Sequence, residues 1–477
     1  MRPSSNSRLE LWARCGMLPL ALVAVGCMQA APASAASPAS TASPYPAGAT
    51  RPLRVATPAE LAHAASATGG SSAPTTGASK PTTGTSKSTT GSSKSTTGAS
   101  RRTSKKRPKP KPKPVLHGNA ARALAAFEAM QRAYSIQGSG LYTGEPFSYL
   151  WPFSQAFAAT VTMANVEGIA KIPGLTALLK RELSARLTGL NSYLDLSNSG
   201  APEGTFTSTL AGFDGTVAPP AGPGGTKYYD DNEWVGIELL RLYAQTHSAA
   251  LLGSAEGIMA FVMAGWETTG PQGQKLACPG GIPFSNAAEN RERNTVTNAP
   301  AAELGAELYK LTGNTQYLQF AELAYEWVRA CLTQSNGLYA DHIYPNAAIE
   351  AIEWSYNQGT MIGAGTLLYQ ATGGSAYLYQ ARQTAKAALA YYTAERLGSE
   401  NPFFVSVYFR NVLYLDSVTH DPPGAQLVQP YVNYAWEHER LSGNVFVAGS
   451  PASAQLLVQA AVVQDYALMS SPPSTYF

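Results

Sequence analysis

From residue 118 to the end of the chain, apolar side chains recur at intervals of three and four residues, the spacing of helices with one buried face. Runs of alternating β-branched residues, which would indicate strands, are few. The pattern therefore predicts an all-α fold of about twelve helices. We expect them near residues 118–135, 151–167, 174–196, 230–247, 250–267, 294–312, 314–333, 355–372, 374–395, 402–418, 422–441 and 452–470.

An internal repeat pairs these helices. The segments LYAQTHSAALLGSA (242–255), LYKLTGNTQYLQFA (308–321) and LYQATGGSAYLYQA (368–381) share leucine, tyrosine, threonine and alanine at matching positions. Gly313 and Gly373 stand where a helix end favours a left-handed residue, so each segment is predicted to be a short turn between antiparallel helices. The long segments that lead into the first helix of each pair are rich in glycine, proline and aromatic residues: 136–150, 197–229, 268–293 and 334–354.

Six such helical hairpins can close into a ring, which predicts an (α/α)6 toroid, and an open helical solenoid is the alternative architecture. In the ring, the first helix of each pair lines the inside, and the helix starts and long loops gather at one mouth. The polar and aromatic side chains at those helix starts then converge. They are Trp151, Gln155, Asp230, Asp231, Asn298, Tyr356, Asn357 and Gln358.

The N-terminus lacks this periodicity. Basic residues precede a short apolar stretch at 16–28, and small residues follow it, which is the pattern of a signal peptide over residues 1–35. The stretch is too short to span a bilayer as a helix, and no later stretch is long and apolar enough. We therefore expect a secreted protein, extracellular or associated with the cell wall, with lipoprotein anchoring at Cys27 as the lesser alternative.

Residues 36–114 are rich in Ser, Thr, Gly, Lys and Pro and contain a seven-residue repeat that begins TTGASKP at Thr75. A chain of this composition cannot bury enough apolar surface to offset the entropy of folding, so it is predicted to be a disordered linker. The folded catalytic domain is expected at residues 115–477.

Charge divides sharply between the linker and the domain. The linker carries 13 Lys or Arg and one Glu, a net charge of +12, whereas residues 115–477 carry 18 Lys or Arg and 29 Asp or Glu, a net charge of −11. A nucleic-acid-binding domain would carry positive charge on its folded part, so the pattern excludes nucleic acid as a partner. The basic linker could hold the domain near anionic cell-wall polymers, although we favour a solvated spacer.

Cys278 and Cys331 are the two cysteines of the expected domain. They suffice for one disulfide in an oxidising compartment, with two buried thiols as the alternative. The chain has six histidines and no CxxC or HExxH motif, so we expect neither a protein-bound metal nor a cofactor.

The segment YYDDNEW (228–234) places two carboxylates, Asp230 and Asp231, side by side at a predicted helix start. One interpretation is electrostatic, because acidic residues stabilise the positive end of a helix dipole. The other is catalytic: retaining glycosidases use two carboxyl groups about 5–5.5 Å apart, and mutual repulsion raises the pKa of one of them. Aromatic loops around an acidic cleft suit a neutral carbohydrate, so the ring architecture favours the catalytic interpretation.

These residues also resemble glycoside hydrolase family 76, the α-1,6-mannanases of the (α/α)6 class, over most of residues 118–420. A double aspartate alone would be a weak signal, but several motifs in matching order and spacing are specific. The motifs are YDDNEW (229–234) with ELLRLY (238–243), GGI (280–282), TNA (297–299) before Leu308 and Tyr309, WSYNQG (354–359) before Leu368 and Tyr369, and Phe404 and Arg410 within FFVSVYFRN.

By this resemblance Asp230 is the nucleophile and Asp231 the acid/base, with retention at the anomeric carbon. Family members usually continue GGI with tryptophans, whereas this chain has Pro283 and Phe284, so its substrate-stacking surface differs. The substrate-binding residues expected from the resemblance and from the predicted mouth together are Trp151, Gln155, Tyr229, Asn298, Tyr356, Asn357 and Gln358.

Four further polar residues lie near the predicted site or in its helices. We expect Glu233 to face water or to pair locally, with a role in the site as the lesser alternative. We expect His342, in the loop before the YNQG helix, to be an isolated surface histidine, with a place beside Asp341 at the rim of the cleft as the lesser alternative. Arg410 forms either a buried ion pair or a contact that orients a carboxylate, and the sequence favours neither. Glu353 is the substitute acid should the assignment of the acid/base fail.

The sequence thus predicts a secreted, tethered glycoside hydrolase that cleaves α-mannosidic bonds, α-1,6 bonds foremost, in a mannan or a related cell-envelope glycan. A transglycosylase with the same carboxyl pair, a hydrolase of another specificity and a non-catalytic glycan-binding toroid are the alternatives. The expected partner is a polysaccharide or oligosaccharide substrate, and the expected oligomeric state is a monomer.

Overall fold

The computed structural model describes residues 114–196, 211–270, 273–453 and 455–477, all within one unit of the chain. The expected signal peptide, and the expected linker up to residue 113, lie outside these residues. Helices dominate the described part, at close to the positions that the apolar pattern predicts. None of the described helices combines the length and the apolar character that a membrane span requires.

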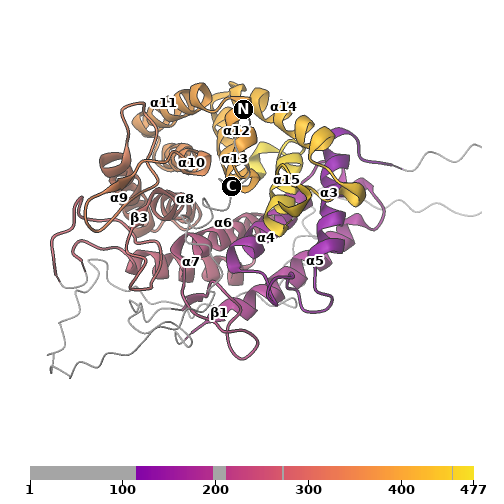
Figure 1. Ribbon diagram of the computed structural model, residues 1–477, viewed down its shortest axis with the longest axis horizontal. Helices are drawn as coiled ribbons and strands as arrows, with labels where there is room; N and C mark the ends of the chain where they lie inside the picture. The colour runs from indigo at the N-terminus through magenta and orange to yellow at the C-terminus, as the bar shows by residue number, and fades with distance from the viewer. Residues whose placement is uncertain (1–113, 197–210, 271–272, 454) are drawn as a thin grey trace, which may run out of the picture. The chain divides into compact units, whose positions relative to one another are not determined.

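Six helices form an inner ring (Figure 1): α4 (Leu150–Ala164), α6 (Tyr229–Thr246), α8 (Thr295–Thr312), α10 (Ser355–Thr372), α13 (Pro402–Thr419) and α15 (Leu456–Leu468). Each packs on the next in this order, and α15 packs on α4, which closes the ring. Most of their residues are buried because each inner helix has a neighbour on both sides and an outer helix behind it.

Six further helices surround the ring: α5 (Leu175–Leu190), α7 (Ala249–Ala264), α9 (Thr315–Leu332), α11 (Ser375–Tyr391), α14 (Pro423–His438) and α3 (Gly118–Tyr134). The first five each follow an inner helix and pack on it, whereas the sixth pair joins the two ends of the domain, because α15 packs on α3. A short helix that the pattern does not predict, α12 (Ala394–Ser399), precedes α13. The closed ring confirms the predicted toroid and excludes the open solenoid.

The turns of the sequence repeat end their helices as predicted. Gly313 and Gly373 follow α8 and α10 with φ of 72° each, and His247 occupies the same place after α6 with φ of 52°. In all three turns the amide of the left-handed residue donates a hydrogen bond to the carbonyl of the repeat tyrosine four residues earlier. Each turn therefore reverses the chain from an inner helix to its outer partner.

Short antiparallel strands brace the long loops at the N-terminal ends of the inner helices. One sheet pairs β1 (Leu194–Asp195) with β2 (Gly212–Phe213), and the other has the order β3 (Arg293–Asn294), β4 (His342–Ile343), β5 (Ile349–Glu350). Since β3 precedes α8 whereas β4 and β5 precede α10, the second sheet joins two neighbouring loops, with His342 opposite both Asn294 and Glu350. Single 3₁₀ turns are η1 (Ile169–Lys171), η2 (Asn191–Tyr193), η3 (Ser442–Asn444), η4 (Pro451–Ser453) and η5 (Pro473–Thr475).

Cys278 and Cys331 form a disulfide, which decides between the two alternatives for these cysteines. The bond joins the loop before α8 to the outer helix α9. In the same loop, Gly280 and Gly281 have φ of 105° and 92°, and a Cβ atom on either would lie 2.9 or 2.7 Å from the ring of Trp327. Only glycine fits this close approach of backbone to indole, which explains the GGI motif structurally.

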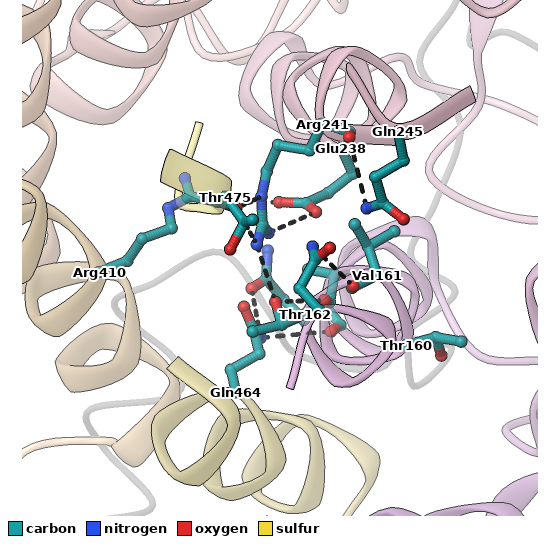
Figure 2. Close-up of polar contacts among 12 residues, drawn as sticks. Thr160, Val161, Thr162, Glu238, Arg241, Gln245, Arg410, Gln464 and Thr475 are labelled. Atoms are coloured by element: carbon teal, nitrogen blue, oxygen red, sulfur yellow. Dashed lines mark hydrogen bonds and ion pairs between the residues drawn. The ribbon is translucent and has the colours of Figure 1, made fainter. Parts of the chain in front are cut away.

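Buried ions hold the other end of the ring together (Figure 2). Arg241 Nη1 donates to Glu238 Oε2 at 2.7 Å, and Arg410 Nη1 donates to Glu238 Oε1 at 2.8 Å. Arg241 Nη2 also donates to the carbonyl of Thr475, and the guanidinium of Arg410 lies 4.9 Å from the ring centre of Phe477. Arg410 therefore forms a buried ion pair, and the C-terminal residues cover the ring interior opposite the mouth.

Candidate active site

Asp230 and Asp231 occupy the first turn of α6, at the mouth of the ring. The Asp231 side chain is 7% exposed, Asp230 is half-buried, and Asp230 Oδ1 has no hydrogen-bond partner among the described residues. Burial raises the pKa of Asp230 to about 7, although backbone N–H groups at the helix start lower it in part. Burial, with the charge of Asp230, raises the pKa of Asp231 well above its ordinary value. Both carboxyl groups therefore lose their protons at a higher pH than ordinary aspartates do.

A third carboxylate, Asp341, lies beside this pair, and its charge adds to the raised pKa of Asp230. Asp341 comes from the loop before α10 and is held from two sides. Asn357 Nδ2 donates to Asp341 Oδ1 at 2.9 Å, and His342 Nδ1 is hydrogen-bonded to Asp341 Oδ2 at 2.8 Å. Loop and helix together thus bring Asp341 and Asn357 to the mouth.

His342 is 8% exposed, so the expectation of an isolated surface histidine was wrong. It lies in β4, the central strand of its sheet, between β3 and β5, which bury it. Two signals in the sequence pointed this way: the acidic residue immediately before it, and its place in a loop that leads into an inner helix.

An aromatic wall formed by Trp151, Tyr356 and Phe404 lines another part of the mouth. Tyr356 stacks on Phe404 with ring centres 4.2 Å apart, and Trp151 stacks on the same residue at 5.9 Å. Phe404 is buried, whereas Trp151 and Tyr356 are half-buried. The structure thus brings together two of the predicted substrate-binding residues, from α4 and α10, through a phenylalanine of α13.

Four inner helices carry a buried amide at their fourth residue, and we call this set the amide clamps: Asn232 in α6, Asn298 in α8, Gln358 in α10 and Gln459 in α15. Each hydrogen-bonds to the backbone of the loop that enters its helix. Asn298 is typical: its Oδ1 accepts from the amide of Ile282 at 2.8 Å, and its Nδ2 donates to the carbonyls of Ile282 and Asn294.

Gln358 repeats this arrangement in the next loop. Its Oε1 accepts from the amide of Tyr339 at 2.8 Å, and its Nε2 donates to the carbonyls of Tyr339 and Trp354. Asn298 and Gln358, both predicted to bind substrate, thus use their amides to fix the loops that form the mouth.

Two other predicted substrate-binding residues lie away from the carboxyl pair. Tyr229 stacks on Phe261 of the outer helix α7 with ring centres 4.7 Å apart, so its ring packs between α6 and α7. Gln155 is buried, and its Oε1 accepts from Gln464 Nε2 of α15 at 3.3 Å. The structure does not bring either side chain into the group around Asp230.

Glu233 is fully buried, and neither carboxylate oxygen has a hydrogen-bond partner among the described residues. The expectation that it faces water or pairs locally was therefore wrong, because the ring encloses α6 from Asp231 to Leu242. Burial, with the charges of Asp230 and Glu303, raises the pKa of Glu233 well above its ordinary value. Glu303, fully buried in α8, has its pKa raised to about 8 by burial. A second acidic pair thus lies beneath the first.

The substitute acid, Glu353, accepts a hydrogen bond from Asn336 of its own loop at 2.7 Å. Its charge adds to the raised pKa values of Tyr391 and Tyr392, outside the inner ring, and does not contribute to those of the pair in α6. Phe284 stands where family members usually have a tryptophan. Its ring contacts that of Tyr228, two residues before Asp230, with ring centres 5.3 Å apart. Within the described residues, no group of three or more His, Cys, Asp or Glu could hold a metal ion.

A closed ring of six helical hairpins with a buried carboxyl pair at its mouth is the architecture of the (α/α)6 glycoside hydrolases. The chain matches the model of glycosyl hydrolase family 76 over residues 119–405 and belongs to that family.

Curated relatives match part of the chain. Mannan endo-1,6-alpha-mannosidase DCW1 of Saccharomyces cerevisiae is 32% identical over 107 residues, 20% of this chain and 24% of the relative. The protein of the same name from Candida albicans is 27% identical over 210 residues, 41% of this chain and 42% of the relative. The chain thus matches less than half the length of these relatives.

Solved structures share the fold. The family 76 mannosidase Bt3792 from Bacteroides thetaiotaomicron superposes with a TM-score of 0.62 at 19% identity, covering 74% of this chain and 98% of that one. An inactive variant of an α-1,6-mannanase of Salegentibacter sp. HEL1_6 superposes with a TM-score of 0.58 at 19% identity, covering 74% and 99%. In that variant two consecutive aspartates are replaced by asparagine, and it is in complex with α-1,6-mannotriose.

Proposed function

We propose that this protein hydrolyses α-mannosidic bonds, α-1,6 bonds foremost, by a retaining double displacement at Asp230 and Asp231. The observation that carries the proposal is the adjacent carboxyl pair at the mouth of the ring, where Asp231 is buried, Asp230 is half-buried, and burial raises the pKa of both. The family membership and the names of the curated relatives support the substrate. The inactive double variant of a structural relative supports the role of two consecutive aspartates.

In the first step, the ionised carboxylate of Asp230 forms a bond to the anomeric carbon. The bond from that carbon to the glycosidic oxygen breaks, and the proton of Asp231 passes to that oxygen. In the second step, Asp231 takes a proton from water, the water oxygen bonds to the anomeric carbon, and the ester bond to Asp230 breaks. Two inversions give net retention.

The environments of the two carboxyl groups support this division of roles. Backbone N–H groups at the helix start stabilise the ionised form of Asp230, as a nucleophile requires. Asp231 receives no comparable stabilisation and lies next to the charge of Asp230, so it holds the proton that the leaving oxygen needs.

The mouth offers contacts for a sugar ring beside the pair. The half-buried rings of Trp151 and Tyr356 would take the apolar face of a pyranose, whereas Asp341, held by Asn357, would bind its hydroxyls. Asn357 is fully buried and contributes by holding Asp341 Oδ1. The signal-peptide pattern over residues 1–35 supports our further proposal of an exported enzyme acting on a cell-envelope glycan.

The direct test is incubation of the full chain with unbranched α-1,6-mannan, and with α-1,2- and β-1,4-linked mannans for comparison, followed by mass analysis of the products. We expect manno-oligosaccharides from the α-1,6 polymer. Products longer than a supplied oligosaccharide would show transfer instead of hydrolysis. Binding without products would show a glycan-binding toroid, and cleavage of only another polymer would show a different specificity. Each of these three results would overturn the proposal.

A further inference from the structure

Two exposed tyrosines lie at the mouth of the ring, on either side of the carboxyl pair. Tyr149 immediately precedes α4 and is 61% exposed, and Tyr344 lies in the loop before α10 and is 39% exposed. Around the ring, α6 with its carboxyl pair stands between α4 on one side and α8 and α10 on the other. A single exposed tyrosine is ordinary on a protein surface, so it is the position of these two beside the carboxyl pair that singles them out.

Contacts with its own loop hold Tyr344 in place. His342 packs against its ring at right angles with centres 4.4 Å apart, and the backbone amide of Tyr344 donates to the carbonyl of Ala348 at 2.8 Å. His342 is in turn bound to Asp341, which accepts from Asn357. A continuous set of contacts therefore runs from the inner helix α10 to the exposed ring, so the ring is held in place.

His342 adds an observation that points to a ligand. Its side chain is 11% exposed, and its buried Nε2 has no hydrogen-bond partner among the described residues. An unpartnered polar atom in a buried side chain costs free energy unless a bound group satisfies it. The hydroxyl groups of a sugar stacked on Tyr344 would supply that partner.

Tyr149 lies on the other side of the carboxyl pair, and its backbone is fixed at the start of α4. The amide of the next residue, Leu150, donates to the carbonyl of Gly215 at 2.9 Å, which fixes the backbone that carries the tyrosine. Tyr149 lies near Tyr228, which directly precedes α6 and is itself beside the carboxyl pair. Tyr149 thus approaches the pair from the α4 side, as Tyr344 does from the α10 side.

We propose that Tyr149 and Tyr344 are stacking platforms for pyranose units on the two sides of the cleavage site, so that the mouth binds the interior of a glycan chain. This inference rests on the proposed function and adds to it two substrate-binding residues outside the carboxyl pair. An aromatic ring offers the apolar face of a pyranose a contact without demanding one hydroxyl pattern. Each platform therefore increases the affinity for a long substrate, whereas a short substrate does not reach it.

The chain supplies its own controls. Tyr379 on α11 is 65% exposed and Tyr434 on α14 is 54% exposed, and both helices lie outside the ring. Replacing either by alanine removes the same group from the surface without altering the mouth. Tyr344→Phe keeps the ring and removes only the hydroxyl, so it should behave as the unchanged protein.

The experiment measures kcat/KM of the full chain on α-1,6-manno-oligosaccharides of increasing length. For Tyr149→Ala and Tyr344→Ala we expect about a tenfold loss on the longest substrates, little change on the shortest, and a shift of cleavage toward chain ends. The Tyr379→Ala and Tyr434→Ala controls should lose nothing. Equal losses at every length, or no loss relative to these controls, would overturn the inference.

A second measurement separates this inference from the proposed function. Calorimetric titration of the Asp230→Asn, Asp231→Asn double variant with long oligosaccharides reports binding without turnover, and adding Tyr344→Ala should weaken that binding about tenfold. If the unchanged chain does not cleave but the tyrosine still affects binding, the proposed function fails and the platforms stand. If the chain cleaves and the tyrosine affects neither measurement, only the platforms fail.

Discussion

At the scale of single residues, the site is defined by carboxyl groups that the fold removes from water. Asp231 and Glu233 are buried within the first turns of α6, and Asp230 beside them has an oxygen without a partner among the described residues. Burial without a counter-ion favours the neutral acid, so these groups keep protons that exposed carboxylates would lose. The N–H groups of the helix start stabilise the charge of Asp230 but not that of Asp231, so the purely electrostatic interpretation does not account for the second aspartate.

Replacing either aspartate should abolish turnover and spare binding. We expect Asp231→Asn to lower kcat about 10²- to 10⁴-fold, because the leaving oxygen loses its proton donor, and Asp230→Asn to lower it at least as much. Steady-state kinetics on α-1,6-manno-oligosaccharides measure both effects. The exposed Asp421→Asn is the matched control. Retained turnover in both variants would refute the assignment of the pair.

The pH dependence of kcat/KM should depend on Asp341. Because the pKa of Asp230 is about 7, kcat/KM should fall as the pH drops below that value and the nucleophile gains a proton. The charge of Asp341 contributes to the raised pKa, so Asp341→Asn should lower the pKa of Asp230 and move this acidic limb to lower pH. The measurement is kcat/KM against pH for both proteins, and an unmoved limb would show that Asp341 does not act on the nucleophile.

At the scale of elements, the mouth depends on loops that the amide clamps hold against the inner helices. Loss of one clamp leaves buried backbone groups without partners, at a cost of about 1–3 kcal/mol. We therefore expect Asn298→Ala to lower the free energy of unfolding by that amount, and Gln319→Ala, an exposed amide on α9, to leave it unchanged. Urea unfolding followed by circular dichroism measures both, and equal stabilities would contradict the clamp.

The positions and ends of the helices could be predicted because they depend on local sequence. The partners of the amide clamps could not, because they depend on tertiary packing. Helix positions and the left-handed Gly313 and Gly373 follow from apolar spacing and backbone sterics. Asn298 and Gln358 were correctly placed at helix starts, but their amides bind backbone groups of their own loops, and such partners depend on the packed loop. Burial of Glu233 and His342 likewise depends on the ring and the small sheet around them, which periodicity does not encode.

At the scale of the whole molecule, the ring interior contains two kinds of buried charge. Near the C-terminal segment, Glu238 pairs with Arg241 and Arg410 and remains compensated. Nearer the mouth, Glu233 has no hydrogen-bond partner among the described residues, and Glu303 has only the longer contact of 4.0 Å to Arg410 Nη2. Burial raises the pKa of both. The closed ring therefore holds neutral acids between the site and the ion pairs, and its stability should depend on pH.

Glu303→Gln tests this dependence. The pKa of Glu303 is about 8 in the fold against an ordinary 4.5, so its contribution to stability is fully present below the ordinary value and is lost as the pH rises through about 8. Over this window the free energy of unfolding should fall more steeply in the unchanged protein than in the variant, by up to about 1.4 kcal/mol per pH unit. Exposed Glu395→Gln is the control, and identical slopes for the unchanged protein and Glu303→Gln would refute the buried neutral acid.

The most direct test of the central claim, retaining hydrolysis at Asp230 and Asp231, is proton NMR of the full chain during its first turnovers on unbranched α-1,6-mannan. Double displacement predicts that new reducing ends appear first as the α anomer and reach the equilibrium mixture only later. Initial appearance of the β anomer would show single displacement with inversion, and would contradict the assignment of Asp230 as nucleophile.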